Sequence, residues 1–335
     1  MVWVKLIICI LLIFISGKRV AKYGDIIAVK SGLGGVWIGF VLLALVTSLP
    51  ELFNGVSAIT LIGEPDLTVG NILGANAFNI FNLAMLDIAY QNAPILASAS
   101  QTHRLTSWSS LIMVAVIATG IFVDFRFSFF GLLWLGWYAP VIVLLYFVFV
   151  RVIYIFEQRR HSPPETGRDY GEEKSWKVYC YFAVSAVIII GAGIWLAFIG
   201  DEIALVTRWG KSFVGSLILA FSTTLPEMTV SYTAMRMGAT DMAIANMIGS
   251  NLFNATIIPI DDLLHIKAPV LSAVSESHLI TAVLVIVMTL LFIFGIGRKP
   301  RRFFRLSWWN VIIIGLFLAG AYFSFTGASL SFLAQ

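Results

Sequence analysis

Apolar segments long enough to cross a lipid bilayer follow one another along almost the entire chain. Hydrophobic residues make up 59% of the 335 residues and charged residues only 12%, a balance that soluble domains do not have. A transmembrane helix needs about 20 apolar residues, and inside lipid the backbone must satisfy its own hydrogen bonds. The sequence therefore predicts an all-α integral membrane protein.

The hydropathy pattern predicts ten spanning helices with short connections. The expected spans are residues 2–29, 35–61, 66–90, 105–123, 127–157, 175–207, 211–237, 241–264, 276–296 and 306–330. The longest polar segment, 158–174, reads as a linker between a first five-helix unit (1–157) and a second (175–335). No small-residue cleavage site follows the first apolar stretch, so we expect no cleavable signal peptide.

Basic residues gather on one side of the predicted helices. Of the 22 lysines and arginines, 17 fall on the side of the linker, and the other five are Lys5, Arg126, Arg208, Lys211 and Lys267. The positive-inside rule then places the linker in the cytoplasm and both termini outside, in a plasma or inner membrane. The basic residues are dispersed over several loops, so they do not indicate a nucleic-acid surface. We expect the chain to work as a monomer.

The second half of the sequence repeats the first. At an offset of 176 residues, GDIIAVKSGLGGVWIGFVLLALVTSLPE lies over GDEIALVTRWGKSFVGSLILAFSTTLPE, and at an offset of 175, NILGANAFN lies over NMIGSNLFN. Chance rarely aligns glycine, aspartate, proline, glutamate and asparagine together in apolar helices. Five is an odd number of spans, so the second copy enters from the opposite side. The chain is predicted to be an inverted-topology repeat, an architecture typical of transporters.

A proline stands inside a predicted span in each half, at Pro50 and Pro226. Proline has no N–H to bond the carbonyl four residues earlier, and its ring opens the preceding turn. In lipid an unpaired carbonyl is costly unless it faces protein or a watery cavity. We therefore expect broken helices near the membrane midplane, with the carbonyls of Ala44 and Ala220 facing a shared interior.

Oxygen-bearing side chains flank both predicted breaks, where Glu51 and Glu227 directly follow the prolines. The hydroxyl groups nearest to the breaks belong to Thr47, Ser48, Thr223 and Thr224. Hard cations such as Ca²⁺ and Na⁺ take oxygen ligands, whereas softer metals favour nitrogen or sulfur. An intramembrane glutamate is costly enough that a functional role is the default reading, and the amide oxygens of Asn79 and Asn254 would complete a cation shell. The alternative is a protonated glutamate that serves only a helix contact.

The remaining polar residues have structural readings beside functional ones. Asp87, Asp261 and Asp262 would form a peripheral cation site at the mouth of the pathway or, alternatively, cap solvated helix ends. Asn71, Asn76, Asn246 and Asn251 could belong to the cation site or, alternatively, form interhelical hydrogen bonds. Cys9 and Cys180 lie in apolar helices without metal-ligand spacing and are expected to be packing residues. No aspartyl, zinc or serine nucleophile motif of a membrane enzyme is present, so we expect no enzyme.

At these residues the sequence resembles the cation/Ca²⁺ exchanger superfamily, and most closely its prokaryotic-type sodium/calcium exchangers. The resemblance covers nearly the whole chain and rests on the paired TSLPE/TTLPE and GANAFN/GSNLFN segments. It implies antiport of Ca²⁺ and Na⁺ by alternating access, with no cofactor besides the transported ions. The cation ligands that it implies are Glu51, Glu227, Thr47, Ser48, Thr223, Thr224, the carbonyls of Ala44 and Ala220, Asn79, Ser250 and Asn254.

Several positions bear on the coupling ion. The proton-coupled branch of the superfamily typically has asparagine before the acidic residue, and Leu-Pro-Glu in both halves favours Na⁺. Val46 and Ser222 stand where many relatives have glycine, Ala75 lacks the hydroxyl of a sodium ligand, and Asn254 leaves the centre with two carboxylates. The sequence therefore leaves open an antiporter of Ca²⁺ or another divalent cation coupled to H⁺. A cation channel is the alternative of a different class.

Overall fold

The structure, a computed structural model, describes residues 2–89, 99–127, 131–132, 134–160, 175–207, 220–298, 302–303 and 306–326. Most of the predicted linker, the first nine residues of the expected span 211–237 and the last four of 306–330 lie outside these residues. Every one of the ten expected spans meets helical structure within the described part of the chain.

Nine helices of 17 residues or more make up most of the described chain. They are α1 (Val2–Ser31), α5 (Pro65–Ala89), α7 (Thr102–Phe127), α8 (Tyr138–Arg160), α9 (Ser175–Thr207), α11 (Ala220–Arg236), α12 (Thr240–Leu264), α13 (Ser277–Gly295) and α14 (Trp308–Thr326). The short elements are the hairpins β1–β2 (Gly131–Leu132, Leu135–Gly136) and β3–β4 (Arg302–Phe303, Leu306–Ser307) and the 3₁₀ turn η4 (Val270–Ala273).

The expected span 35–61 is an interrupted helix. It consists of α2 (Gly35–Trp37), the π-helical η1 (Ile38–Leu43), α3 (Ala44–Thr47), α4 (Leu49–Ser57) and the π-helical η2 (Ala58–Ile62). Ser48 separates α3 from α4, with φ −92° and ψ 4°, and Pro50 lies in the first turn of α4. Proline is tolerated there because its missing N–H would have no helical partner. The break therefore falls two residues before the first Pro–Glu pair.

Seven helical segments of the described chain are long and apolar enough to cross a membrane by length and composition. The helix Trp308–Phe323 is apolar but shorter. Large apolar side chains also face outward, such as Leu11 at 53% exposure, Phe147 at 65% and Val187 at 69%. In a soluble protein such surfaces would aggregate, whereas lipid solvates them. These helices are those of a membrane protein.

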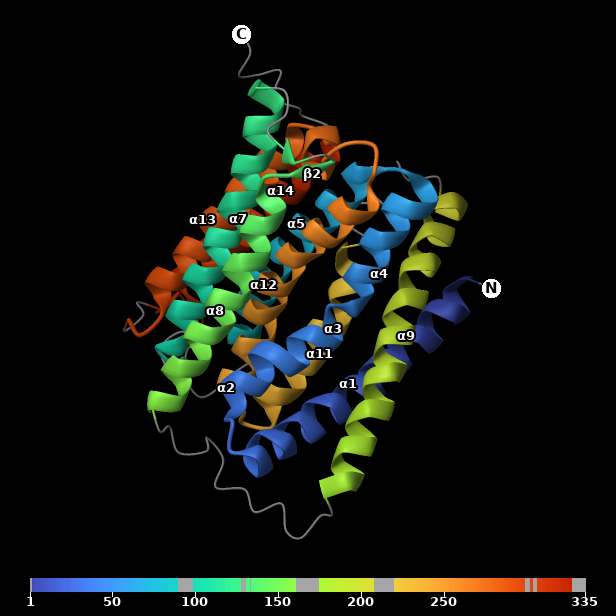
Figure 1. The fold of residues 1–335 in the computed structure, drawn as a ribbon. Helices are drawn as coiled ribbons and strands as arrows, with labels where there is room; N and C mark the ends of the chain where they lie inside the picture. Colours follow the sequence, from blue (N-terminus) through green and yellow to red (C-terminus); the bar gives the residue numbers. More distant parts are fainter. Residues whose placement is uncertain are drawn as a thin grey trace.

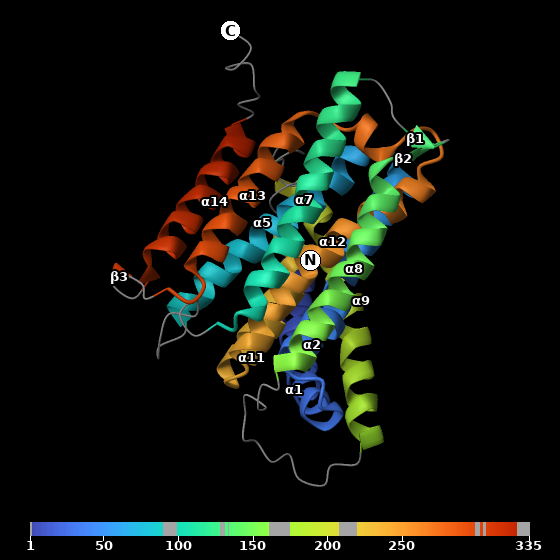
Figure 2. The ribbon, with the colours of Figure 1, turned by 60° about the vertical axis from the view of Figure 1, so that its left-hand side comes forward.

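The helices that carry the repeated polar residues lie in the middle of the molecule. Figure 1 shows α12, α11, α5 and the α3–α4 segment at the centre, and α1 and α9 crossing obliquely along one side. Helices α7, α8, α13 and α14 cover the other side, as the turned view of Figure 2 also shows. Helix α12 packs against α5, α7, α8, α11, η1 and α3, so its side chains form the core of the bundle.

Two details differ from the expected spans. Helix α8 begins at Tyr138, because residues before it form the β1–β2 hairpin, in which Gly131 pairs with Gly136. The Tyr138 hydroxyl fixes this corner by donating to Asp262 Oδ1 at 2.7 Å. The second expected break is also absent, since α11 stays helical through Pro226. There the hydroxyl of Thr224 donates to the Phe221 carbonyl at 3.3 Å, within the same helix.

Candidate cation site

The two glutamates of the Pro–Glu pairs are fully buried in the centre of the bundle. Glu51 lies on α4 and Glu227 on α11, each at 0% exposure, and their charges are close enough to interact. Ser48 Oγ donates to Glu227 Oε1 at 3.0 Å. Both oxygens of Glu51 and Oε2 of Glu227 have no hydrogen-bond partner. Buried carboxylate oxygens without donors are expensive, and a bound cation is one group that would complete their surroundings.

Threonines beside the glutamates make matching contacts across the two halves. Thr47 Oγ1 donates to Asn246 Oδ1 at 3.4 Å, and Thr223 Oγ1 donates to Asn71 Oδ1 at 3.3 Å. Thr47 also lies 3.4 Å from the hydroxyl of Ser250. Ala75 is at the position equivalent to Ser250 and carries no hydroxyl. The hydroxyl groups of the site are therefore arranged almost, but not fully, alike in the two halves.

Four asparagines join α5 to α12 by reciprocal hydrogen bonds. Asn76 Nδ2 donates to the Asn251 carbonyl at 3.4 Å, and Asn251 Nδ2 donates to the Asn76 carbonyl at 3.1 Å. Asn79 Nδ2 donates to Asn251 Oδ1 at 2.9 Å, and Asn254 Nδ2 donates to Asn76 Oδ1 at 3.1 Å. All four side chains are buried at 0% exposure. Asn76 and Asn251 thus serve the interhelical role that the sequence offered as an alternative.

These bonds orient the two asparagines that were expected to be ligands. Because Asn79 and Asn254 each use their amide nitrogen as a donor, their Oδ1 atoms point elsewhere, and both Oδ1 atoms are buried without a partner. Together with Glu51 and Glu227 they present five buried oxygens that receive no hydrogen bond. Carboxylate and amide oxygens are ligands for Ca²⁺ and Na⁺. The chemistry of this donor set fits a hard cation with two compensating charges.

Comparison with known proteins agrees with this chemistry. The family model described as "Sodium/calcium exchanger protein" matches residues 1–155 and 177–330, which is most of the chain. The chain belongs to the sodium/calcium exchanger family.

Two relatives and a solved structure resemble the chain over most of its length. The inner membrane protein YrbG of Escherichia coli is 24% identical over 257 residues, 76% of each chain, and the putative antiporter CaxA of Alkalimonas amylolytica is 25% identical, covering 73% of this chain and 75% of CaxA. A structure of the sodium-calcium exchanger NCX_Mj, soaked with Na⁺ and Sr²⁺, matches with TM-score 0.73 at 18% identity, over 96% of this chain and 99% of that chain. The two proteins share a fold.

Two of the expected ligand positions of this exchanger-family chain, Ala44 and Thr224, already take part in hydrogen bonds. The carbonyl of Ala44 already accepts hydrogen bonds from Ser48 N at 3.0 Å and from Thr47 Oγ1 at 3.4 Å. The Thr224 hydroxyl donates to the Phe221 carbonyl. Ala220 is the first residue described in α11. The oxygens without partners therefore come from the glutamates and asparagines, with Thr47, Ser48, Thr223 and Ser250 beside them.

The structure does not bring the three expected peripheral aspartates together. Asp87 accepts from Asn310 Nδ2 at 2.7 Å at the start of α14, whereas Asp262 accepts from Tyr138 and from the Gly136 and Val270 N–H groups at 2.6–2.7 Å. Among the described residues, no three His, Cys, Asp or Glu side chains form a group that could hold a metal. Asp87 and Asp262 instead anchor neighbouring loops, and Asp261 is buried with both carboxylate oxygens unpartnered.

Two histidine–aspartate pairs connect the halves and were not singled out from the sequence. His103 Nε2 lies 2.8 Å from Asp241 Oδ1, and His278 Nε2 lies 2.9 Å from Asp66 Oδ1. The backbone N–H of Ser100 also donates to Asp241, and that of Ser275 donates to Asp66. Every residue of one pair is 175 positions from its equivalent in the other. The repeat offset, applied to the histidines, would have found them.

Gly249 of α12 lets the interrupted helix approach the centre of the molecule. A Cβ atom at this position would lie 2.3 Å from the Phe40 carbonyl oxygen and 2.9 Å from Ala44 Cβ. Real Cβ atoms do not approach a backbone oxygen so closely, so a larger side chain would push η1 and α3 away. The packing of α12 against the turn that ends at Ser48 therefore depends on this glycine.

We expect Gly249→Ala to destabilise the protein by about 1–3 kcal/mol, the usual cost of inserting a methyl group into a packed core. The measurement is thermal unfolding of the purified protein in detergent. Gly315→Ala in α14 is the control, because nothing lies within 4 Å of its Cβ position and alanine favours a helix. Equal melting temperatures for the two variants would contradict the close approach at Gly249.

Proposed function

We propose that this protein exchanges Ca²⁺ for Na⁺ across a membrane by alternating access, with the cations bound between Glu51 and Glu227. The observation that carries the proposal is the group of five buried, unpartnered oxygens from both halves of the chain. Membership of the sodium/calcium exchanger family supports the choice of ions. In this proposal the carboxylates are surrounded by the side chains of Thr47, Ser48, Thr223, Ser250, Asn79 and Asn254. The Thr224 hydroxyl and the carbonyls of Ala44 and Ala220 are further proposed ligands.

We further infer that residues 1–157 and 175–335 form an inverted repeat. Reciprocal contacts support it, because a two-fold axis places residue i of one unit against j of the other and j against i. Asn76 and Asn251 bond to each other in both directions. Three other contacts each have an equivalent in the repeat: Asn79–Asn251 matches Asn254–Asn76, Thr47–Asn246 matches Thr223–Asn71, and His103–Asp241 matches His278–Asp66. Two inverted halves provide matching inward-facing and outward-facing states.

Charge neutralisation couples the movement of the two ions in this mechanism. Two buried carboxylates without a counter-charge oppose passage of the site through the low-dielectric interior. One Ca²⁺, or a set of Na⁺ ions, removes that opposition, so the loaded protein changes state and the empty one does not. Exchange is thereby favoured over leak.

The orientation follows from the asymmetry of basic residues. The positive-inside rule places the linker in the cytoplasm and both termini outside the membrane. The chain is proposed to reside in a plasma or inner membrane and to work as a monomer, because both carboxylates of the site come from one chain. The transported cations and the surrounding lipid are then the partners that exchange itself requires.

Dependence on a sodium gradient is the expected property that tests this function. Proteoliposomes loaded with Na⁺ and diluted into Na⁺-free buffer should accumulate radioactive Ca²⁺, whereas vesicles loaded with choline at the same pH should show only background uptake. The sodium-loaded signal should disappear when an ionophore dissipates the gradient.

Two other results would overturn the sodium-coupled function. Uptake that ignores Na⁺ but follows a pH gradient would indicate proton coupling. Uptake that needs no counter-ion at all would indicate a channel.

A further inference from the structure

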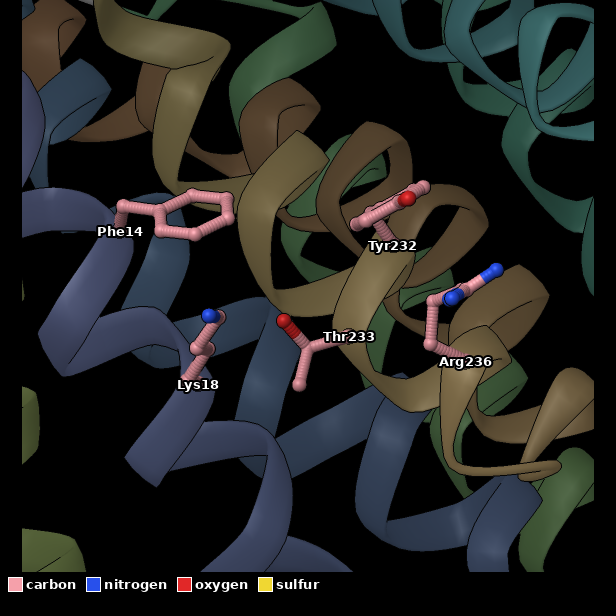
Figure 3. Close-up of a pocket in the computed structure, with 5 residues that line it drawn as sticks. All are labelled: Phe14, Lys18, Tyr232, Thr233 and Arg236. Atoms are coloured by element: carbon pink, nitrogen blue, oxygen red, sulfur yellow. The ribbon is translucent and has the colours of Figure 1, made fainter. Parts of the chain in front are cut away.

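A cavity of about 350 Å³ lies between α1 and α11, away from the cation site. Phe14 and Lys18 of α1 line one wall, and Tyr232, Thr233 and Arg236 of α11 line the other (Figure 3). The cavity thus combines two cationic groups with two aromatic rings, a combination that suits an anion attached to an apolar body.

The polar groups of this cavity have few partners of their own. Among the described residues, no carboxylate forms an ion pair with Lys18 or Arg236. The Lys18 ammonium lies 4.3 Å from the centre of the Phe14 ring. Thr233 is buried at 9% exposure, and its hydroxyl has no hydrogen-bond partner. Figure 3 shows this hydroxyl and the Lys18 ammonium pointing toward one another, so a bound anion would meet both.

Apolar side chains continue from the cavity along both helices. On α1, Leu11 and Ile15 are 53% and 51% exposed, and on α11, Met228 is 39% exposed. All three precede Lys18 or Arg236 in their helices, so they lie on the membrane side of the two cations. A free anion would bury none of this apolar surface, whereas the acyl chains of a lipid would cover it.

The two basic residues of the cavity have no basic counterparts in the sequence repeat. Lys18 and Arg236 correspond to Ile194 and Thr60 at the 176-residue offset, so the equivalent place in the repeat carries no cation. Both basic residues lie on the side that the proposed orientation makes cytoplasmic. Anionic lipids give that leaflet its negative surface potential, to which basic juxtamembrane residues respond.

We propose that this cavity binds the phosphate headgroup of an anionic phospholipid, held by Lys18, Arg236 and the Thr233 hydroxyl, with its chains along α1 and α11. The bound lipid would bridge α1 to the helix that carries Glu227. The inference rests on the proposed orientation but not on the identity of the transported ions, so a failed exchange assay would leave it standing.

The test is binding of phosphatidylglycerol to the full-length protein, measured by native mass spectrometry and by thermal unfolding in detergent. We expect wild-type protein to retain phosphatidylglycerol in preference to phosphatidylcholine and to be stabilised by it. Lys18→Gln/Arg236→Gln should weaken phosphatidylglycerol binding by about 10- to 30-fold, as expected for the loss of two surface charges. Thr233→Val, which keeps the shape but removes the hydroxyl, should weaken it less.

The matched control is Arg19→Gln/Arg159→Gln, which removes the same charge from exposed positions that do not line the cavity. Equal loss of phosphatidylglycerol in both double variants would overturn the site, since any basic residue would then suffice. Equal binding of the two lipids to wild type would also overturn it. Stabilisation by glycerol 3-phosphate or inorganic phosphate as strong as by phosphatidylglycerol would show that a free anion is the occupant.

Discussion

Glutamine in place of either Glu51 or Glu227 is expected to abolish Ca²⁺ exchange while the protein still folds. The substitution keeps the shape of the side chain but removes one of two buried charges, and a divalent cation then keeps one unbalanced charge in the core. Removing one partner of a buried charge pair costs several kcal/mol. Each 1.4 kcal/mol or so corresponds to a factor of ten in binding, so exchange should fall by about 100-fold or more. Uptake into sodium-loaded proteoliposomes is the measurement.

Thermal unfolding separates loss of the site from loss of the fold. Without cations the glutamine variants should be as stable as wild type or more so, because repulsion between the carboxylates is relieved. Ca²⁺ should raise the melting temperature of wild type and of Glu64→Gln, an exposed control, but not that of the site variants. Exchange at the wild-type rate in either site variant would show that the carboxylates are not the ligands.

Valine at position 193 is expected to arrest exchange through packing alone. Gly193 of α9 lies against both prolines of the repeated pairs, and a Cβ atom there would be 2.6 Å from Pro50 Cγ and 3.4 Å from Pro226 Cγ. Valine would displace the turns that position Glu51 and Glu227. Misplacement of a reactive or binding group by about 1 Å can cost up to a hundredfold, and we expect at least a tenfold loss of exchange.

Gly191→Val is the matched control for this variant. Gly191 is exposed two residues away on the same helix, and nothing lies within 4 Å of its Cβ position. The Gly191→Val variant undergoes the same glycine-to-valine change but without a contact to either proline. It should therefore exchange Ca²⁺ at nearly the wild-type rate. Similar activity in the two variants would show that contact of α9 with the prolines does not matter.

The helices and the central polar residues could be predicted because lipid leaves the chain few choices. A long apolar run in lipid satisfies its backbone hydrogen bonds most readily as a helix, and a duplicated Pro–Glu pair in such runs indicates a shared role. The burial of Glu51 and Glu227, and the cross-half partners of Thr47 and Thr223, agree with that reasoning. Whether these residues bind the transported cations stays a prediction.

Features that depend on contacts could not be predicted in the same way. The segment before Tyr138 is as apolar as a helix, yet Gly131 pairs with Gly136 in a hairpin, beside which the Tyr138 hydroxyl donates to Asp262. Hydropathy does not distinguish the two structures. Likewise Asp87 and Asp262 look like open carboxylates in the sequence, whereas their donors come from residues far along the chain.

The two Pro–Glu segments are also less alike in structure than in sequence. Ser48 sends its hydroxyl across to Glu227, and the helix breaks there, whereas Thr224 keeps its hydroxyl within its own helix, which continues. Serine and threonine differ by one methyl group, so the offset alignment treats them as equivalent. The offset alignment alone therefore does not distinguish a broken helix from a continuous one.

The hydroxyl pair of Thr47 and Ser250 makes the proposed site asymmetric, because Ala75 stands at the position equivalent to Ser250 in the first half. In the proposed function, the two halves of the cation site therefore differ by one hydroxyl group. Gradients alone fix where exchange stops, but the speeds of approach from the two faces need not be equal. A carrier built this way can act as a partial rectifier, moving Ca²⁺ faster in one direction than in the other under mirrored gradients.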